Sequence, residues 1–218
     1  MAIETFGVER QQHSRQSWLD CRNIEDEKRW ELIDGQLYAM SSPSLLHQII
    51  SRQLVIQLAP FFAGGPCQLL FAPLDVKLSE HDLVQPDLLV VCNPDQLRPN
   101  YVEGPPQLII EILSPSTHRH DRVRKLNLYG RAGVAEYWLV TPHLPLVEVL
   151  LNGKGLFTTV AACTERDTLR SPSFPQLQLD LSTVFANLPE QPPIDEVRES
   201  TPHDYAVREP AGPVTPGS

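Results

Sequence analysis

The run Leu108-Ile109-Ile110-Glu111-Ile112-Leu113 decides the fold, because it is an almost continuous apolar segment of strand length. Continuous apolar runs, as opposed to alternating ones, are typical of strands that are covered on both faces of a sheet. A second run of this kind, Leu88-Leu89-Val90-Val91, precedes it in the chain. We therefore predict that both runs form central strands of one buried sheet.

Around these two strands, the hydrophobic pattern switches between strand and helix periods, which predicts a mixed α/β fold. We expect further strands at 30–33, 36–40, 67–71, 75–78, 136–140, 146–151 and 157–160, and helices at 15–22, 44–62, 119–132 and 181–187. Asp34-Gly35 between the first two strands is a strong signal for a tight hairpin. Gly64-Gly65 and Gly133 end the two long helices.

The length of 218 residues suits one domain with a well-buried core better than two small domains. We expect this domain to span residues 1–188. The segment 189–218 contains seven prolines, six acidic residues and two basic ones, with little apolar periodicity. Such a composition buries too little apolar surface to offset the entropy of ordering, so we expect a disordered tail.

Composition also bears on compartment and partners. No stretch reaches the roughly 20 apolar residues of a membrane helix, and the N-terminus lacks a secretion signal, so we expect a cytoplasmic protein with no membrane partner. Cys21, Cys67, Cys92 and Cys163 lack Cys-x-x-Cys spacing, which argues against a zinc site and a disulfide framework and predicts small buried side chains. The net charge of -9 opposes general attraction to nucleic acid, so DNA binding would need a local basic patch.

Two acidic residues occupy positions where an ionised carboxylate is costly to bury. Glu111 lies inside its apolar run, and Asp87 stands at the start of the other, directly after Pro86. If the two strands are neighbours, their carboxylates converge at one edge of the sheet, where Mg²⁺ is the common partner of oxygen ligands. From spacing alone, Asp87 could equally cap a turn and Glu111 pair with an arginine.

Lys125 lies on the apolar-leaning side of the helix that follows Glu111, the side that also carries Tyr129. Its ammonium can therefore reach back toward that carboxylate. An ion pair with Asp121, one turn away on the same helix, is the alternative. The segment 118–131 is locally basic, with five Arg or Lys residues and two His against one acid, and would suit phosphate; a solvated helix face has the same composition.

Four motifs stand in a fixed order along the chain. They are Trp-Glu-Leu-Ile-Asp-Gly at 30–35, Pro-Asp-Leu-Leu-Val-Val at 86–91, Ile-Glu-Ile-Leu-Ser-Pro-Ser-Thr at 110–117 and Gly-Val-Ala-Glu-Tyr-Trp-Leu-Val at 133–140. Together they resemble the Uma-two family, formerly a domain of unknown function, which is assigned to the PD-(D/E)XK superfamily of nucleases. The resemblance covers about 15–188 and implies a restriction-endonuclease-like fold, with a central mixed β-sheet flanked by helices.

The resemblance also implies roles for individual residues. The acidic pair of the superfamily matches Asp87 and Glu111, and the further acid of such sites matches Glu31, for which an ordinary hairpin carboxylate is the alternative. The lysine of the superfamily stands two residues after the second acid, where this chain has Leu113. Within the family, the lysine has moved to the following helix, and Lys125 matches it.

Three further positions are interpreted with the resemblance in mind. His47 matches a common family histidine, which either lines the cleft or makes one hydrogen bond at the edge of the core. Thr141 replaces the aspartate that usually follows the Tyr-Trp-Leu-Val strand, at a position we interpret as structural. The run Ser114-Pro115-Ser116-Thr117 is interpreted as a turn and helix cap, because no base stands at a set spacing from it.

We therefore expect a magnesium-dependent endodeoxyribonuclease, a hydrolase of phosphodiester bonds in DNA. Asp87, Glu111 and Glu31 are its expected metal ligands, with Mn²⁺ as a substitute metal, and Lys125 orients the attacking water. The second hypothesis is a catalytically inactive nuclease-fold module that binds nucleic acid or a protein partner through 119–131. Nothing in the sequence excludes RNA as the substrate, and a homodimer would suit the cutting of two strands.

Overall fold

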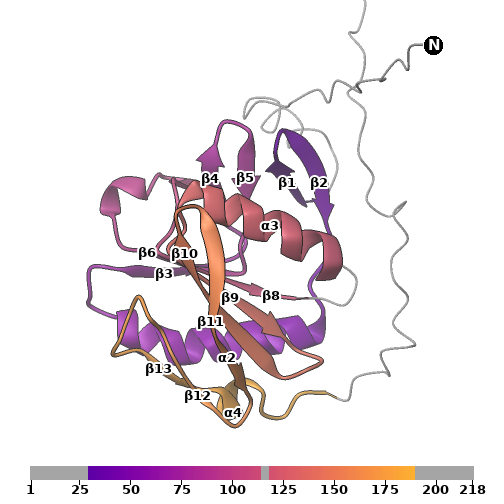
Figure 1. Cartoon of the computed structure of the whole chain (residues 1–218), viewed down its shortest axis with the longest axis vertical. Helices are drawn as coiled ribbons and strands as arrows, with labels where there is room; N and C mark the ends of the chain where they lie inside the picture. Colours follow the sequence, from indigo (N-terminus) through magenta and orange to yellow (C-terminus); the bar gives the residue numbers. More distant parts are fainter. Residues whose placement is uncertain (1–28, 114–117, 190–218) are drawn as a thin grey trace, which may run out of the picture.

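A computed structural model describes residues 29–113 and 118–189, which form two larger β-sheets, one two-stranded sheet and three α-helices (Figure 1). The helix expected at 15–22, the turn at 114–117 and all but the first residue of the tail lie outside the described residues. No helix within the described ranges is long and apolar enough to cross a bilayer.

The larger sheet contains both strands that the sequence predicts to be central. Its order is β11 (Leu156–Thr164), β10 (Leu146–Gly153), β9 (Glu136–Thr141), β8 (Leu108–Ile112), β6 (Leu88–Val91) and β3 (Gln68–Phe71). Strands β8 and β9 are parallel, and every other neighbouring pair is antiparallel. The mixed central sheet of the expected α/β fold is thus confirmed.

The smaller sheet carries the N-terminal hairpin. Its order is β2 (Gln36–Met40), β1 (Arg29–Ile33), β5 (Asp82–Val84), β4 (Asp75–Ser79) and β7 (Tyr101–Glu103). Asp34 and Gly35 join β1 to β2 with φ of 51° and 72°, the left-handed pair that a tight hairpin turn of the right twist requires. Strands β5 and β7 were not expected from the sequence, because three residues each are too few to show a period.

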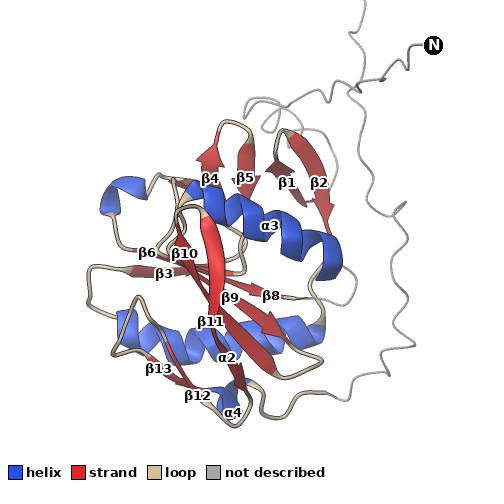
Figure 2. Cartoon of the chain, in the orientation of Figure 1, coloured by secondary structure: helices blue, strands red, loops and turns tan. Residues whose placement is uncertain are grey.

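Helices cover both faces of the larger sheet, as the continuous apolar strands predict (Figure 2). On one face lies α2 (Leu45–Phe62), whose buried residues recur at Leu46, Ile50, Leu54 and Leu58. The other face is covered by α3 (His118–Ala132), which buries Leu128 and Tyr129. Because successive strand residues alternate between the faces, the sheet separates two apolar cores.

The C-terminal part of the described chain packs beside α2. It consists of β12 (Thr168–Arg170), β13 (Gln178–Asp180) and α4 (Leu181–Val184), whereas the short 3-10 helix η1 (Pro94–Gln96) lies between β6 and β7. The Gln57 side chain of α2 donates to the carbonyl of Asp180 at 3.1 Å and accepts from its amide at 3.0 Å. This pair of hydrogen bonds fixes the two-stranded sheet against the helix.

Cys67 and Cys92 form a disulfide, which corrects the expectation that the cysteines are unpaired. Cys67 precedes β3 and Cys92 follows β6, and these antiparallel strands place Gln68 opposite Val91. The two cysteines are therefore the next facing pair, and a cross-strand disulfide needs no Cys-x-x-Cys spacing. Cys163 is a half-buried free thiol, and Cys21 lies outside the described residues.

Candidate active site

Glu111 of β8 is held by two donors from α3. Its Oε1 accepts a hydrogen bond from the Tyr129 hydroxyl at 2.7 Å and lies 3.1 Å from the Lys125 ammonium. Lys125 and Tyr129 are one helical turn apart, so both side chains lie on the face of α3 that covers the sheet. The structure therefore brings Lys125 to Glu111, as the sequence predicted, and replaces the arginine partner considered for Glu111.

Lys125 also binds Glu31, which comes from the smaller sheet. The Lys125 Nζ lies 3.1 Å from Glu31 Oε1, and the same oxygen accepts a hydrogen bond from the Gln85 amide at 3.0 Å. The exposed fractions of Glu31, Glu111 and Lys125 are only 6%, 8% and 7%. Glu31 is therefore not an ordinary hairpin carboxylate, because one buried lysine links it to an acid of the other sheet.

Asp87 lies at the start of β6, directly beside Glu111. Leu88 pairs with Ile110 in the antiparallel register of β6 and β8, so the next facing pair is Asp87 and Glu111. The Asp87 Oδ2 accepts a hydrogen bond of 2.7 Å from the Ile112 amide. The two acids that the sequence predicted to converge are thus neighbours on adjacent strands.

His47, in the first turn of α2, completes the surroundings of Asp87. Its Nε2 lies 3.0 Å from Asp87 Oδ1, and its Nδ1 is buried with no hydrogen-bond partner among the described residues. Burial alone would lower the pKa of His47, but the hydrogen bond and negative charge of Asp87, helped by Glu111, outweigh burial and raise it. The sequence offered two alternatives for His47, a side chain that lines the cleft or one that makes a single hydrogen bond at the edge of the core. The structure shows both features, since His47 bonds to Asp87 and lines a cavity.

Glu31, Asp87 and Glu111 form an acid cluster around Lys125, and burial and charge set the protonation of Glu111 within it. Burial, together with the charges of Asp87 and Glu31, raises the pKa of Glu111 to about 7, against the lowering effects of Lys125 and of the Tyr129 hydrogen bond. Burial and the adjacent Glu111 also raise the pKa of Tyr129 well above its usual value. Tyr129 therefore remains a neutral donor, while Glu111 titrates near neutral pH.

Two members of the cluster had no role in the sequence analysis. Tyr129 was placed on the correct helix face but was treated as apolar, although a tyrosine four residues after Lys125 can present its hydroxyl to the same partner. Gln85, which precedes the Pro-Asp motif, donates its side chain to Asp75 Oδ1 at 2.8 Å. Its own Oε1 is buried without a hydrogen-bond partner in the described part of the chain.

The donor set suits a hard divalent cation. Proteins commonly hold Mg²⁺ with one or two carboxylates, and water or substrate phosphate supplies the other ligands. Asp87 and Glu111 provide two such carboxylates, and the charge of Asp87 raises the cost of ionising Glu111, a cost that a cation would remove. Among the described side chains, no group of three or more Asp, Glu, His or Cys residues could hold a metal ion by itself.

The described basic side chains of α3 are paired within the chain, so they do not form the patch of free cations that one interpretation of the sequence predicted; the side chains of His118, Arg119 and His120 lie outside those described. Their partners are Glu148 for Arg122, Glu31 and Glu111 for Lys125, Asp34 and Asp82 for Arg131, and the face of the Tyr38 ring for Arg124. These contacts tie α3 to both sheets. The alternative ion pair between Asp121 and Lys125 involves a side chain outside those described.

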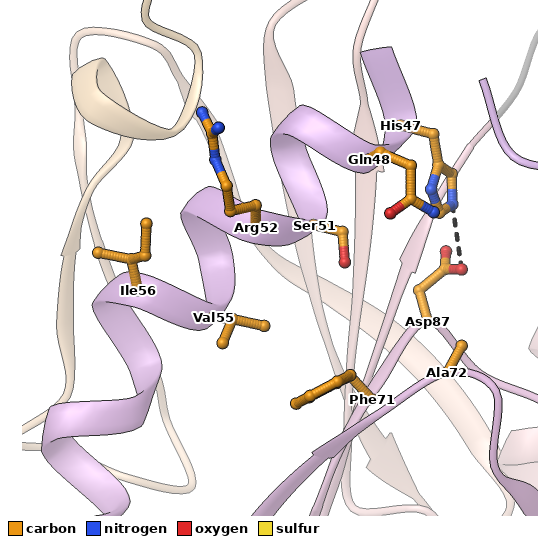
Figure 3. A pocket seen from close by; sticks show the side chains of 9 residues that line it. All are labelled: His47, Gln48, Ser51, Arg52, Val55, Ile56, Phe71, Ala72 and Asp87. Carbon is orange, nitrogen blue, oxygen red and sulfur yellow. Dashed lines mark ion pairs between the residues drawn. The ribbon is translucent and has the colours of Figure 1, made fainter. Parts of the chain in front are cut away.

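A cavity of about 320 Å³ opens beside His47 and Asp87 (Figure 3). It lies between α2 and the neighbouring ends of β3 and β6. Its lining is formed by His47, Gln48, Ser51, Arg52, Val55, Ile56, Phe71, Ala72 and Asp87. The acid cluster therefore adjoins a space large enough for part of a ligand.

Known proteins resemble this chain in sequence and in fold. A family model described as "Uma2: Putative restriction endonuclease" matches residues 16–182, which confirms the resemblance to the Uma-two family. An uncharacterized protein of Synechocystis sp. is 30% identical over 128 residues, which are 58% of this chain and 67% of that protein. A crystal structure described as "a putative nuclease belonging to DUF820" from Anabaena variabilis matches with a TM-score of 0.65 at 19% identity, over 79% of this chain and 97% of that one. At this identity the structural match shows the fold alone.

Proposed function

Because this chain belongs to the Uma2 family, described as "Putative restriction endonuclease", we propose that it is a magnesium-dependent endonuclease that hydrolyses phosphodiester bonds of DNA. The observation that carries this proposal is the buried cluster in which Asp87 and Glu111 are cross-strand neighbours and Lys125 reaches Glu111 at 3.1 Å. Two adjacent carboxylates with one buried ammonium are expensive as structure alone, since each charge must be desolvated. They are well suited to a reaction in which negative charge develops on phosphate.

The acids of the cluster would hold the metal. Asp87 and Glu111 are the proposed direct ligands of Mg²⁺ or Mn²⁺, and Glu31 binds the ion through water. When bound, the ion supplies a water of lowered pKa and offsets charge on the phosphate. Glu111 must be ionised to bind a cation, and its pKa of about 7 makes that condition sensitive to pH.

Lys125 is the proposed catalytic cation. Its ammonium lies 3.1 Å from both Glu31 and Glu111, so its position is fixed before any substrate arrives. A donor held in this way can orient the attacking water and stabilise the charge of the transition state without reorganising.

Tyr129 and His47 act as positioning residues. Tyr129 fixes the Glu111 carboxylate through a hydrogen bond of 2.7 Å, and His47 fixes Asp87 from the opposite helix at 3.0 Å. Each acid is thus oriented by a side chain that does not itself touch the reacting phosphate. Such supporting contacts hold ligands in the geometry that a metal needs.

Nicking of supercoiled plasmid DNA with Mg²⁺ or Mn²⁺ tests the proposal. We expect Asp87→Asn, Glu111→Gln and Lys125→Met each to slow nicking on the order of a hundredfold or more. Glu148→Gln is the matched control, because Glu148 is a partly buried carboxylate that pairs with Arg122 outside the cluster. Equal nicking by the wild type and the three cluster variants contradicts the proposal.

The same assay separates an enzyme from a binding module without turnover. Such a module binds DNA with an affinity that is insensitive to Mg²⁺ and to Glu111→Gln, and it leaves the plasmid intact. Arg122 pairs with Glu148, and Arg131 pairs with Asp34 and Asp82, so these two cations are already neutralised within the chain, which argues against α3 as the DNA-binding face of a module. A labelled RNA strand in a parallel reaction determines whether cleavage is restricted to DNA.

A further inference from the structure

The cavity of Figure 3 continues directly from the acid cluster. Asp87 and His47 form one end of its lining, and the rest is contributed by α2 and the end of β3. Its volume of about 320 Å³ is at the lower end of the roughly 300–1,000 Å³ found for ligand pockets. The space therefore suits a single flat group better than an intact stretch of duplex.

Phe71 gives this cavity an aromatic wall. It is the last residue of β3, it is 57% exposed, and it belongs to neither of the two apolar cores of the large sheet. Val55 and Ile56 of α2 line the same space, and Ile56 is also 57% exposed. An exposed phenyl ring beside aliphatic side chains is the kind of platform on which proteins stack nucleobases.

Polar groups accompany this apolar wall. Gln48, Ser51 and Arg52 line the cavity from neighbouring turns of α2, and Figure 3 shows the Arg52 side chain extending away from Asp87 and Phe71. Arg52 provides a cation for a phosphate, while the amide and hydroxyl can bond to the edge of a base. An apolar face combined with an arginine matches one nucleotide, which has a flat ring and an anionic group.

The register of the sheet places this aromatic wall on the strand next to Asp87, one of the candidate metal ligands. Phe71 pairs with Leu88, the residue after Asp87, and the Ala72 amide donates to the Asp87 carbonyl at 3.0 Å. The aromatic wall and the carboxylate are thus held on adjacent strands. A base stacked on Phe71 would belong to a nucleotide next to the phosphate at Asp87.

We infer that the cavity between α2 and β3 is a base-binding subsite for an unpaired nucleotide of DNA, with Phe71 as its stacking residue. A base inside a duplex is stacked between its neighbours and has no free face, so the base must be single-stranded or turned out of the helix. This inference rests on the proposed nuclease function and specifies its substrate. The enzyme acts on DNA with an unpaired nucleotide beside the cut.

Fluorescence anisotropy with the full chain tests the subsite. The probes are a labelled single-stranded oligodeoxynucleotide and its blunt duplex, both in Ca²⁺, which has the same preference for oxygen ligands as Mg²⁺. We expect the wild type to bind the single strand more tightly. Phe71→Ala should weaken single-strand binding by about 5- to 150-fold, the range that loss of one base stack produces, and leave duplex binding unchanged.

Two further substitutions separate stacking from general apolar contact. Phe71→Trp keeps a ring and should bind like the wild type, whereas Phe71→Leu keeps apolar volume without a ring and should bind like Phe71→Ala. Leu156→Ala is the matched control, because Leu156 is a 73% exposed apolar residue at the opposite edge of the same sheet. Circular dichroism checks that each variant is folded.

Salt dependence tests the role of Arg52. Arg52→Ala should reduce the slope of log affinity against log salt by about 0.7, the value for one phosphate contact on a single strand. Arg170→Ala, an exposed arginine of β12, should leave that slope unchanged. A slope that is the same for Arg52→Ala and Arg170→Ala removes Arg52 from the subsite.

The outcomes distinguish this inference from the nuclease proposal. The subsite is wrong if the wild type does not bind the single strand, or if Phe71→Ala binds it as tightly as the wild type does. It is also wrong if Phe71→Leu binds the single strand as tightly as Phe71→Trp does. In those cases, loss of plasmid nicking by Asp87→Asn still supports the nuclease. If Phe71→Ala loses single-strand binding while Asp87→Asn nicks normally, the subsite stands and the proposed catalytic cluster is wrong.

Discussion

Lys125 and Tyr129 contact the same oxygen atom, Oε1 of Glu111, from consecutive turns of α3. One contact is a charge and the other a neutral hydroxyl, so the two residues affect Glu111 differently. The hydroxyl fixes the carboxylate without removing its negative charge. The ammonium favours ionisation, and it also connects Glu111 to Glu31 of the other sheet.

Removal of the Tyr129 hydroxyl should shift the pH dependence of cleavage. The hydrogen bond from Tyr129 lowers the pKa of Glu111, so Tyr129→Phe should raise that pKa above about 7 and move the acid limb of the rate profile to higher pH. Stability should fall by about 1.5–3 kcal/mol, the value of a hydrogen bond to a charged group. Plasmid nicking at several pH values and urea denaturation measure the two effects.

Tyr101→Phe is the control for this variant, since it removes a hydroxyl from β7, outside the cluster. Its rate profile should coincide with that of the wild type. If Tyr129→Phe also retains the wild-type profile, Tyr129 does not control the ionisation of Glu111.

The free energy of unfolding should depend on pH through Glu111. Its pKa is raised from 4.5 to about 7 in the folded protein, so between these values the folded state binds more protons than the unfolded state. Unfolding free energy should therefore fall as pH rises from 5 to 8. Glu111→Gln should reduce this fall, and urea titrations of both proteins at pH 5 and pH 8 measure it. If the unfolding free energy of both proteins changes equally between the two pH values, the assigned pKa of Glu111 is wrong.

Metal affinity should increase with pH across the same interval. A proton must leave Glu111 before the carboxylate can bind Mg²⁺, so below pH 7 the affinity should drop by about tenfold for each pH unit. Isothermal titration calorimetry at pH 6 and 8, in buffers of different ionisation enthalpy, measures both the affinity and the protons released. A pH-independent affinity without proton release would show that Glu111 is not a ligand.

His47 should stabilise the protein most strongly at low pH. Its pKa is raised above 6.5 in the folded state, because the bond to Asp87 outweighs burial. The stabilisation is therefore fully present below pH 6.5 and is lost as pH rises through the folded pKa. His47→Gln should cost more stability at pH 6 than at pH 9, and His143→Gln, on the loop between β9 and β10, serves as the control.

The sequence predicted those parts of the fold that depend on local pattern. The runs at 88–91 and 108–113 are continuous apolar segments, and both form buried strands. Helical periodicity placed Lys125 on the inner face of α3, where it meets Glu111. These predictions succeeded because the period of a segment determines which side chains face the core.

Features that depend on tertiary register were not predictable in this way. The contact between Glu31 and the Gln85 amide spans 54 positions, and the ion pair of Arg131 with Asp82 spans 49. Neither follows from composition or spacing, because the two partners lie in different elements whose relative placement is set by the whole core. The same reason explains why α3 was expected to present free cations to phosphate.

The disulfide between Cys67 and Cys92 makes the strand that carries Phe71, the stacking residue of the proposed subsite, dependent on thiol chemistry. The bond closes a loop with a sequence separation of 25, and the chain-entropy relation assigns such a ring about 3–4 kcal/mol of stabilisation. Strand β3, which carries Phe71, is an edge strand attached to the sheet by β6 alone. Protein purified with a strong reductant and protein purified in air are therefore two distinct chemical species, and affinities measured on one do not transfer to the other.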